Sequence, residues 1–279
     1  MSLDCHGKFV LDTAISRARD KSVLFVPTIC RLQVNEDQRL DVHNSDVPIV
    51  CQSCEARHRG VCGALTPTQL QELSKHTSKH VFRSAEEILG ADEEIHNYHN
   101  ILSGVVKLTK LMADGRQQIV GLQFAPDFLG RPFRRQSNVS AEAATEVRVC
   151  SFTRATLDKL IDHSPSIEHH LHEQALKELD EAREWMLTLG RKSASEKVAS
   201  FLYMIATNIN PETETGNGST SFDLPLKRAD IADFLGLTIE TVSRQITKLR
   251  KAEIIEVRDN RSVTIPNLKR LREVCEEEH

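Results

Sequence analysis

Three cysteines within twelve residues have the spacing of a ligand loop, Cys-x2-Cys-x7-Cys, formed by Cys51, Cys54 and Cys62. Thiolates are soft ligands that suit zinc or an iron–sulfur cluster. A metal centre needs at least a fourth ligand. Cys150, at the end of a β-rich segment, supplies one if the fold brings it near. The other three cysteines, which stand apart in the sequence, are Cys5, Cys30 and Cys275.

The spacing leaves the type of centre open. Zinc sites usually show two paired sets of ligands, whereas the second half here is a single cysteine, and this favours a cluster. Arg57, His58 and Arg59 lie in the loop, where cations would offset the charge of four thiolates. The plainer alternatives are that His58 is an ordinary polar loop residue and that Cys150 is a buried strand thiol.

A second motif, over residues 227 to 249, has the spacing of a helix-turn-helix. Ala232 is small where two helices would cross, Gly236 supplies the turn, and Val242 is placed to be buried in the second helix. Thr238 is the expected N-cap of that helix. The pattern predicts a DNA-binding unit.

The exposed face of the second helix carries side chains that can recognise bases. Glu240, Ser243 and Arg244 share one face at i, i+3 and i+4. Arg244 can donate two hydrogen bonds to guanine, Glu240 can accept from cytosine, and Ser243 can serve a base or a phosphate. The alternative is that Glu240 and Arg244 form a solvated ion pair with no role in DNA binding.

The distribution of charge is consistent with a DNA-binding surface in the C-terminal part of the chain. The chain has 36 Lys and Arg against 40 Asp and Glu, a net charge of −4. From residue 241 to 272, nine basic residues against three acidic ones give +6. Lys248, followed by Arg250 and Lys251, would contact phosphates irrespective of base sequence.

Length and composition exclude several other classes of protein. The 279 residues suffice for two domains, and 39% hydrophobic with 27% charged residues is typical of folded globular proteins. There is no apolar run of roughly 18 residues and no signal-peptide pattern at the start, so we expect a cytoplasmic protein without a membrane partner. The odd number of cysteines, seven, argues against a disulfide framework in that compartment.

The elements that must position these residues follow from hydrophobic periodicity. Short β-rich runs alternate with turns from about residue 81 to 157, and Asp114-Gly115 between two of them is a hairpin signal, so a small antiparallel roll is expected. Pro165 begins a long helix to about residue 189. After a break at Gly190 come a second helix over 193 to 208, a turn-rich surface connection over 211 to 221, and a wing over 254 to 265.

The long helix carries a weak coiled-coil seam. Ala and His among its members bury little area, so dimerisation should be conditional; the alternative is a helix that packs only within its own chain. The seam positions are His172, Leu179 and Met186, with Ala175, Ala182 and Leu189.

Together these features predict an α+β fold: an N-terminal antiparallel β-roll, a long dimerisation helix and a C-terminal winged helix-turn-helix. The expected boundaries are a weakly ordered extension over 1 to 47, a cysteine leader over 48 to 80, the β-roll over 81 to 163, the dimerisation helix over 164 to 191 and the DNA-binding domain over 192 to 279.

From about Pro48 to the wing, the chain resembles the FNR branch of the CRP/FNR transcription regulators, of the FnrN and FnrL type. The leader cysteines, the Val-Cys that ends the roll, the dimer helix and the run Leu-Thr-Ile-Glu-Thr-Val-Ser-Arg at 237 to 244 stand in family order. The resemblance implies that the β-roll is like a cyclic-nucleotide-binding domain. It implies an oxygen-responsive transcription regulator, not an enzyme, that is mainly an activator of anaerobic or microaerobic genes and whose homodimer works with RNA polymerase. It implies an oxygen-labile [4Fe-4S] cluster on Cys51, Cys54, Cys62 and Cys150. It also implies that Glu240, Ser243 and Arg244 recognise TTGAT half-sites of a TTGAT-N4-ATCAA palindrome.

Two departures from the family pattern matter. The x7 gap is longer than in the best-known enteric members, which puts the lability of the cluster in doubt. Residues 130 to 141 lack the Gly-Glu and Arg-Ser pairs with which cyclic-AMP-binding relatives hold the nucleotide, so no nucleotide effector is expected.

Two other functions stay open. One is a small-ligand, cyclic-nucleotide-like regulator with zinc or no metal at the cysteines. The other is an iron–sulfur electron carrier or enzyme with an appended helix-turn-helix. Against the second, no nucleophile–base pair, phosphate loop or paired carboxylates occur in a recognisable setting.

Overall fold

The computed structural model describes residues 47–52, 54–210 and 219–276. The predicted N-terminal extension, apart from Val47, lies outside these residues, as do Cys5 and Cys30 and most of the predicted connection before residue 221.

Between residues 49 and 74, the described part of the cysteine leader forms four short helices. Thr66 and Gln69 form a capping box at the start of the fourth, and Pro67 occupies its first turn, where the missing N–H costs nothing. Val61 and Leu70 are buried in one apolar core with Tyr98 of the roll. The helices are α1 (Ile49–Gln52), α2 (Glu55–Arg59), η1 (Val61–Ala64) and α3 (Pro67–Ser74).

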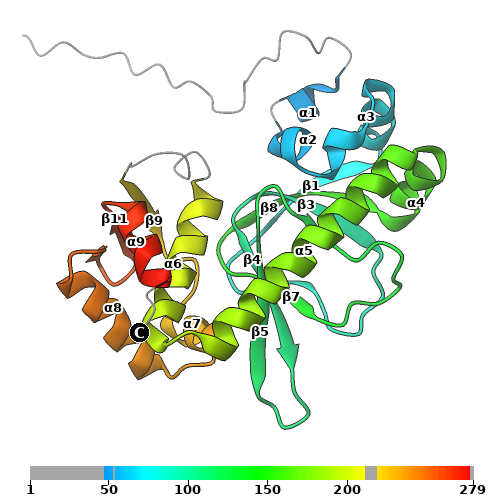
Figure 1. The fold of residues 1–279 in the computed structure, drawn as a ribbon. Coiled ribbons are helices and arrows are strands. Elements are labelled where there is room, and N and C mark those ends of the chain that lie inside the picture. Colours follow the sequence, from blue (N-terminus) through cyan, green and yellow to red (C-terminus); the bar gives the residue numbers. More distant parts are fainter. Residues whose placement is uncertain (1–46, 53, 211–218, 277–279) are drawn as a thin grey trace, which may run out of the picture. The chain divides into compact units, whose positions relative to one another are not determined.

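Two four-stranded antiparallel sheets form the roll, in the orders β1-β8-β3-β6 and β2-β7-β4-β5 (Figure 1). The first strand begins at Thr77, before the predicted start of the roll at residue 81, and pairs with β8. The expected hairpin at Asp114-Gly115 is confirmed, since it joins β4 to β5 and Gly115 has a φ of +84°. The strands are β1 (Thr77–Phe82), β2 (Glu87–Leu89), β3 (Asn97–Ser103), β4 (Val105–Leu111), β5 (Gln117–Phe124), β6 (Phe128–Leu129), β7 (Ser140–Ala143) and β8 (Val147–Thr153).

A short helix, α4 (Arg154–His163), precedes the long helix α5 (Pro165–Arg191). The predicted break at Gly190 is wrong, because α5 continues through it to Arg191. One glycine costs a helix only about 1 kcal/mol, which the flanking turns tolerate. The next helix begins after Ser193, its N-cap. The side chains of Ser193 and Glu196 form the capping box of that helix.

The described residues of the C-terminal domain form four helices and a three-stranded sheet of order β10-β11-β9. The predicted wing is confirmed as β10 and β11. The surface connection was predicted to extend to residue 221, but Thr220 and Ser221 already belong to β9, which pairs with β11 and buries Phe222. The elements are α6 (Ala194–Ile209), β9 (Thr220–Asp223), α7 (Arg228–Leu235), α8 (Ile239–Lys251), β10 (Glu256–Arg258), β11 (Ser262–Ile265) and α9 (Leu268–Cys275).

The predicted fold class, an α+β chain with an antiparallel roll, a long helix and a winged helix-turn-helix, is therefore confirmed. None of the helices described here combines the length and apolar character needed to cross a bilayer.

Candidate cysteine centre and nucleic-acid interface

The four predicted cysteine ligands come together from four separate elements. Cys51 lies on α1, Cys54 precedes α2 as its N-cap, Cys62 lies in η1 and Cys150 lies in β8. In Figure 1 the leader helices lie beside the edge of the sheet that contains β1, β8 and β3. Charge on neighbouring cysteines of the set raises the pKa of Cys51, of Cys62 and of Cys150, so the four thiols lie near one another.

Polar side chains of the sheet contact two of the thiols. Asn100 on β3 faces Cys150 in register, and its Nδ2 donates to Cys62 Sγ at 3.2 Å. Thr77 on β1 hydrogen-bonds Cys150 through its side chain. Lys79 faces Cys150 in register from the other side. The sheet thus aligns a strand cysteine with a leader cysteine.

Burial favours the protonated form of three thiols, those of Cys51, Cys62 and Cys150. It raises the pKa of Cys51 to about 11, with neighbouring thiolates adding to the effect and the cations Arg57 and Lys79 opposing it. Burial also raises the pKa of Cys62 and of Cys150. A positively charged partner would favour ionisation of these three thiols, because bound metal ions displace thiol protons.

The donor set fits a four-iron cluster in number and chemistry, since such a cluster takes four cysteine thiolates. Within the described ranges, no three His, Cys, Asp or Glu side chains are placed to hold a metal ion as they stand. His58 is exposed at the end of α2.

The second site is the helix-turn-helix of α7 and α8. Gly236 adopts a left-handed φ of +62° between the two helices, and the Leu237 N–H bonds the Ala232 carbonyl. Ala232 and Val242 are buried as expected. The Thr238 hydroxyl accepts from the Thr241 N–H at 3.2 Å, so Thr238 is the N-cap.

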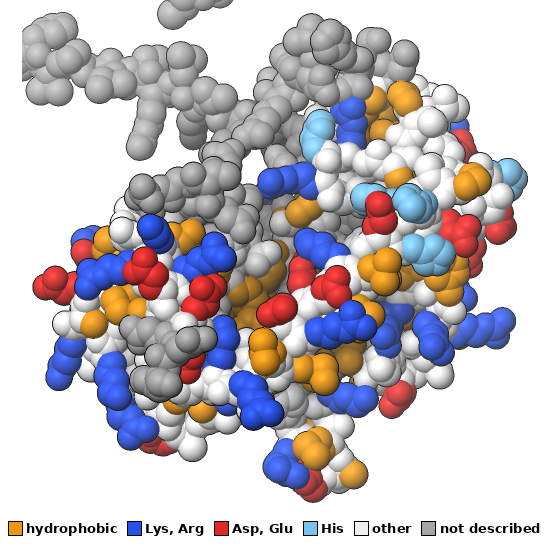
Figure 2. Space-filling view, in the orientation of Figure 1, with side chains coloured by type: hydrophobic (Ala, Val, Ile, Leu, Met, Phe, Trp, Pro, Cys, Tyr) orange, Lys and Arg blue, Asp and Glu red, His pale blue; other side chains and the backbone are white. Residues whose placement is uncertain are grey.

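The outer face of α8 carries the predicted DNA contacts. Glu240, Ser243, Arg244 and Lys248 are all exposed. Hydrogen bonds from its own backbone N–H and from the Thr238 hydroxyl lower the pKa of Glu240, so this carboxylate is ionised. Across the described chain, no ion pair joins Glu240 to Arg244, contrary to the alternative of a solvated pair. Figure 2 shows Lys and Arg side chains along the surface over α8.

Sequence reasoning missed Asn100 and Thr77, the sheet residues that contact the thiols. Thr77 is an ordinary strand residue and gave no signal. Asn100 gave a weak one, since asparagine is depleted in strands and here it lies in a predicted strand next to Ile101.

Comparison with known proteins identifies the architecture. The family described as cyclic nucleotide-binding domain matches residues 79–164, and the Crp-like helix-turn-helix domain matches residues 196–274. A probable transcriptional activator of Rhizobium leguminosarum bv. viciae is 55% identical over 233 residues, which cover 84% of this chain and 96% of that protein. The chain belongs to the CRP/FNR family of transcription regulators.

Other CRP/FNR proteins agree with this assignment. The transcriptional activator protein FnrL of Cereibacter sphaeroides is 37% identical, over 82% of this chain and 94% of its own length. The structure of FixK2 from Bradyrhizobium japonicum superposes with a TM-score of 0.64 at 30% identity, covering 73% of this chain and 99% of that one. The chain is thus a DNA-binding transcriptional activator of the FNR and FixK type, and its relatives are regulators, not enzymes.

Proposed function

We propose that this CRP/FNR regulator senses oxygen through a [4Fe-4S] cluster held by Cys51, Cys54, Cys62 and Cys150. The observation that carries the proposal is the convergence of these four thiols from three leader elements and one strand. A cluster bound there would supply an oxygen-labile covalent link between leader and roll. The four cysteines would donate the thiolates; Cys62 is buried and the other three are partly exposed.

The leader is in direct contact with the long helix, which gives the link a route to the dimer. Ser166 Oγ on α5 donates to the carbonyl oxygen of Ala64 in η1 at 3.2 Å. Ile167 and Leu171 of α5 are buried in the same core as Cys62. Any shift of η1 when its cysteine loses a partner therefore reaches the first turns of α5.

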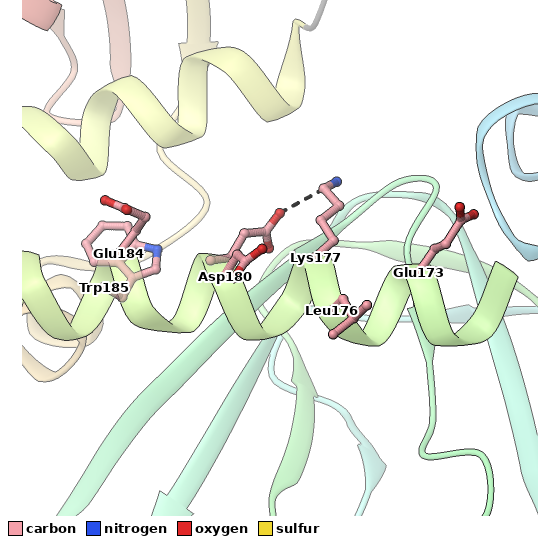
Figure 3. A pocket seen from close by; sticks show the side chains of 7 residues that line it. Glu173, Leu176, Lys177, Asp180, Glu184 and Trp185 are labelled. Carbon is pink, nitrogen blue, oxygen red and sulfur yellow. Dashed lines mark ion pairs between the residues drawn. The ribbon is translucent and has the colours of Figure 1, made fainter. Parts of the chain in front are cut away.

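The remainder of α5 presents apolar side chains to solvent. Leu176, Leu179 and Met186 are 61%, 45% and 73% exposed, and Figure 2 shows hydrophobic side chains along this helix. A shallow hollow beside α5 of about 630 Å³ is lined by Leu176 and Trp185 among charged residues (Figure 3). A second copy of the chain, seated along the heptad seam, would cover the exposed apolar residues and form a homodimer.

A dimer would present two α8 helices about one DNA turn apart, which suits a palindrome of the TTGAT-N4-ATCAA type. Glu240, Ser243 and Arg244 would contact bases, and Lys248 would contact phosphate. Activation of transcription would require RNA polymerase as a partner. We expect this to take place in the cytoplasm.

The test is purification and spectroscopy under nitrogen. We expect about four iron and four sulfide per chain, a broad visible absorbance that air bleaches, and a palindrome gel shift that is lost with it. Cys275→Ser, a buried cysteine of α9 away from the centre, is the matched control and should change none of these. Protein that is colourless and iron-free without air, yet binds the palindrome fully, would overturn the proposal.

A second candidate function is a small-ligand regulator with zinc or no metal at the cysteines. It is favoured by the match of residues 79–164 to the cyclic nucleotide-binding domain family. The same preparation separates the two functions, because zinc without iron and sulfide supports the second and rejects the first.

A further inference from the structure

The Asn100 side chain lies between two of the four thiols. It is 1% exposed on β3, a position directly opposite Cys150 on β8. From there its Nδ2 reaches across 38 residues of sequence to Cys62 Sγ, at 3.2 Å. One amide therefore spans the strand cysteine and the buried leader cysteine.

The Asn100 amide lowers the stability of the fold at this buried position. A buried polar group lowers stability unless its hydrogen bonds are satisfied. Among the described residues, Nδ2 donates to the Cys62 sulfur, and the Oδ1 atom is buried with no hydrogen-bond partner. Its neighbours Tyr98 and Ile101 are fully buried, so an apolar side chain would suit the strand better.

An N–H that points at a thiolate does two things for a metal centre. It stabilises the negative charge on sulfur, and it fixes the direction of the sulfur lone pairs. Such contacts to the ligands of iron–sulfur clusters are among the means by which a protein tunes them. The sheet register adds a third effect here, because β3 holds Asn100, and through it Cys62, opposite Cys150.

From this geometry we infer that Asn100 is a positioning residue for the cysteine centre, holding Cys62 Sγ beside Cys150 so that both thiolates bind the same group. The inference rests on the proposed function. Asn100 would contact a ligand of the cluster and not the iron.

The experiment compares Asn100→Leu with Gln123→Leu. Gln123 on β5 is also a buried amide with one donated hydrogen bond, to the Phe128 carbonyl, and with an unpartnered Oε1. Both variants and the unaltered protein are loaded with iron and sulfide under nitrogen. The readouts are the rate of iron loss to an added chelator, the decay of visible absorbance, and the thermal unfolding midpoint.

We expect Asn100→Leu to lose iron about tenfold faster than the unaltered protein, the size of effect typical for a lost contact to a metal ligand. Gln123→Leu should lose iron at the unaltered rate. The two variants should have similar unfolding midpoints, which separates positioning from a general loss of stability. If Asn100→Leu does not fold, Asn100→Ser serves, because its shorter side chain cannot reach Cys62.

Equal iron loss from the Asn100 and Gln123 variants would overturn the role of Asn100 and leave the proposed function intact. Unaltered protein that takes up no iron and sulfide would instead reject the proposed function, and the role of Asn100 with it.

Discussion

Among single side chains, Arg244 and Lys248 on α8 provide different parts of the proposed DNA affinity. Arg244→Ala removes a bidentate contact to one base pair, so we expect binding to the palindrome to weaken by about 1–3 kcal/mol and discrimination at that position to relax. Lys248→Ala should weaken binding to all sequences and reduce the salt dependence by about one phosphate contact. Titrations at several salt concentrations check both. An equal loss on all sequences for Arg244→Ala would contradict base recognition.

His99 makes the roll sensitive to acid. Burial, and next the charge of His80, lower its pKa from 6.5 to about 4, while its Nδ1 contacts Ser151 Oγ at 2.7 Å. A histidine held neutral contributes stability that is present above pH 6.5 and is lost as the pH falls toward 4. We expect that loss to reach about 2 kcal/mol, allowing for partial exposure of the ring. Urea unfolding at pH 7 and pH 4.5 should show a smaller difference for His99→Gln than for the unaltered protein.

Individual residues also show where prediction from sequence stops. Thr238, Gly236 and Ala232 were identified because the helix-turn-helix constrains each locally, through a cap, a positive φ and a close crossing. Cys150 was predicted as the fourth ligand from its residue type, although no local sequence pattern indicates that it lies near the leader cysteines. Asn100 could not be found, because its role depends on the register of β3 with β8 and on the approach of η1 from 38 residues earlier.

At the scale of elements, the seam of α5 should control assembly. Leu179→Glu introduces two charges per dimer by symmetry, and each buried Leu lost costs about 1.5–3 kcal/mol. The dimer dissociation constant should therefore rise at least about a hundredfold. Leu187→Glu is the matched control, since Leu187 is 53% exposed on the same helix but lies off the heptad seam. Sedimentation under nitrogen distinguishes them, and equal dissociation in both variants would contradict the seam.

Elements with a strong period were predictable and short ones were not. The 27 residues of α5 and the hairpin of β4 and β5 follow from pattern and turn chemistry. The four residues of β9 were assigned in part to a connection, because Thr220 and Ser221 follow a polar, glycine-containing stretch. Pairing with β11, which is distant in sequence, decides that strand.

In the whole molecule, loss of the cysteine centre should be accompanied by dissociation of the dimer. Cys150→Ala removes the one ligand contributed by the roll, so the leader loses its link to the sheet while η1 keeps its contact with α5 through Ser166. We expect the variant, prepared under nitrogen, to lose visible absorbance, dimer formation and palindrome binding in parallel, whereas Cys275→Ala keeps all three. Such a switch needs a free-energy difference of only a few kcal/mol between monomer and dimer. A seam that contains alanine and histidine is weak enough for a difference of that size to decide whether the dimer forms. Oxygen-sensitive dimerisation that persists in Cys150→Ala would show that the link between leader and roll is not what couples the centre to the dimer.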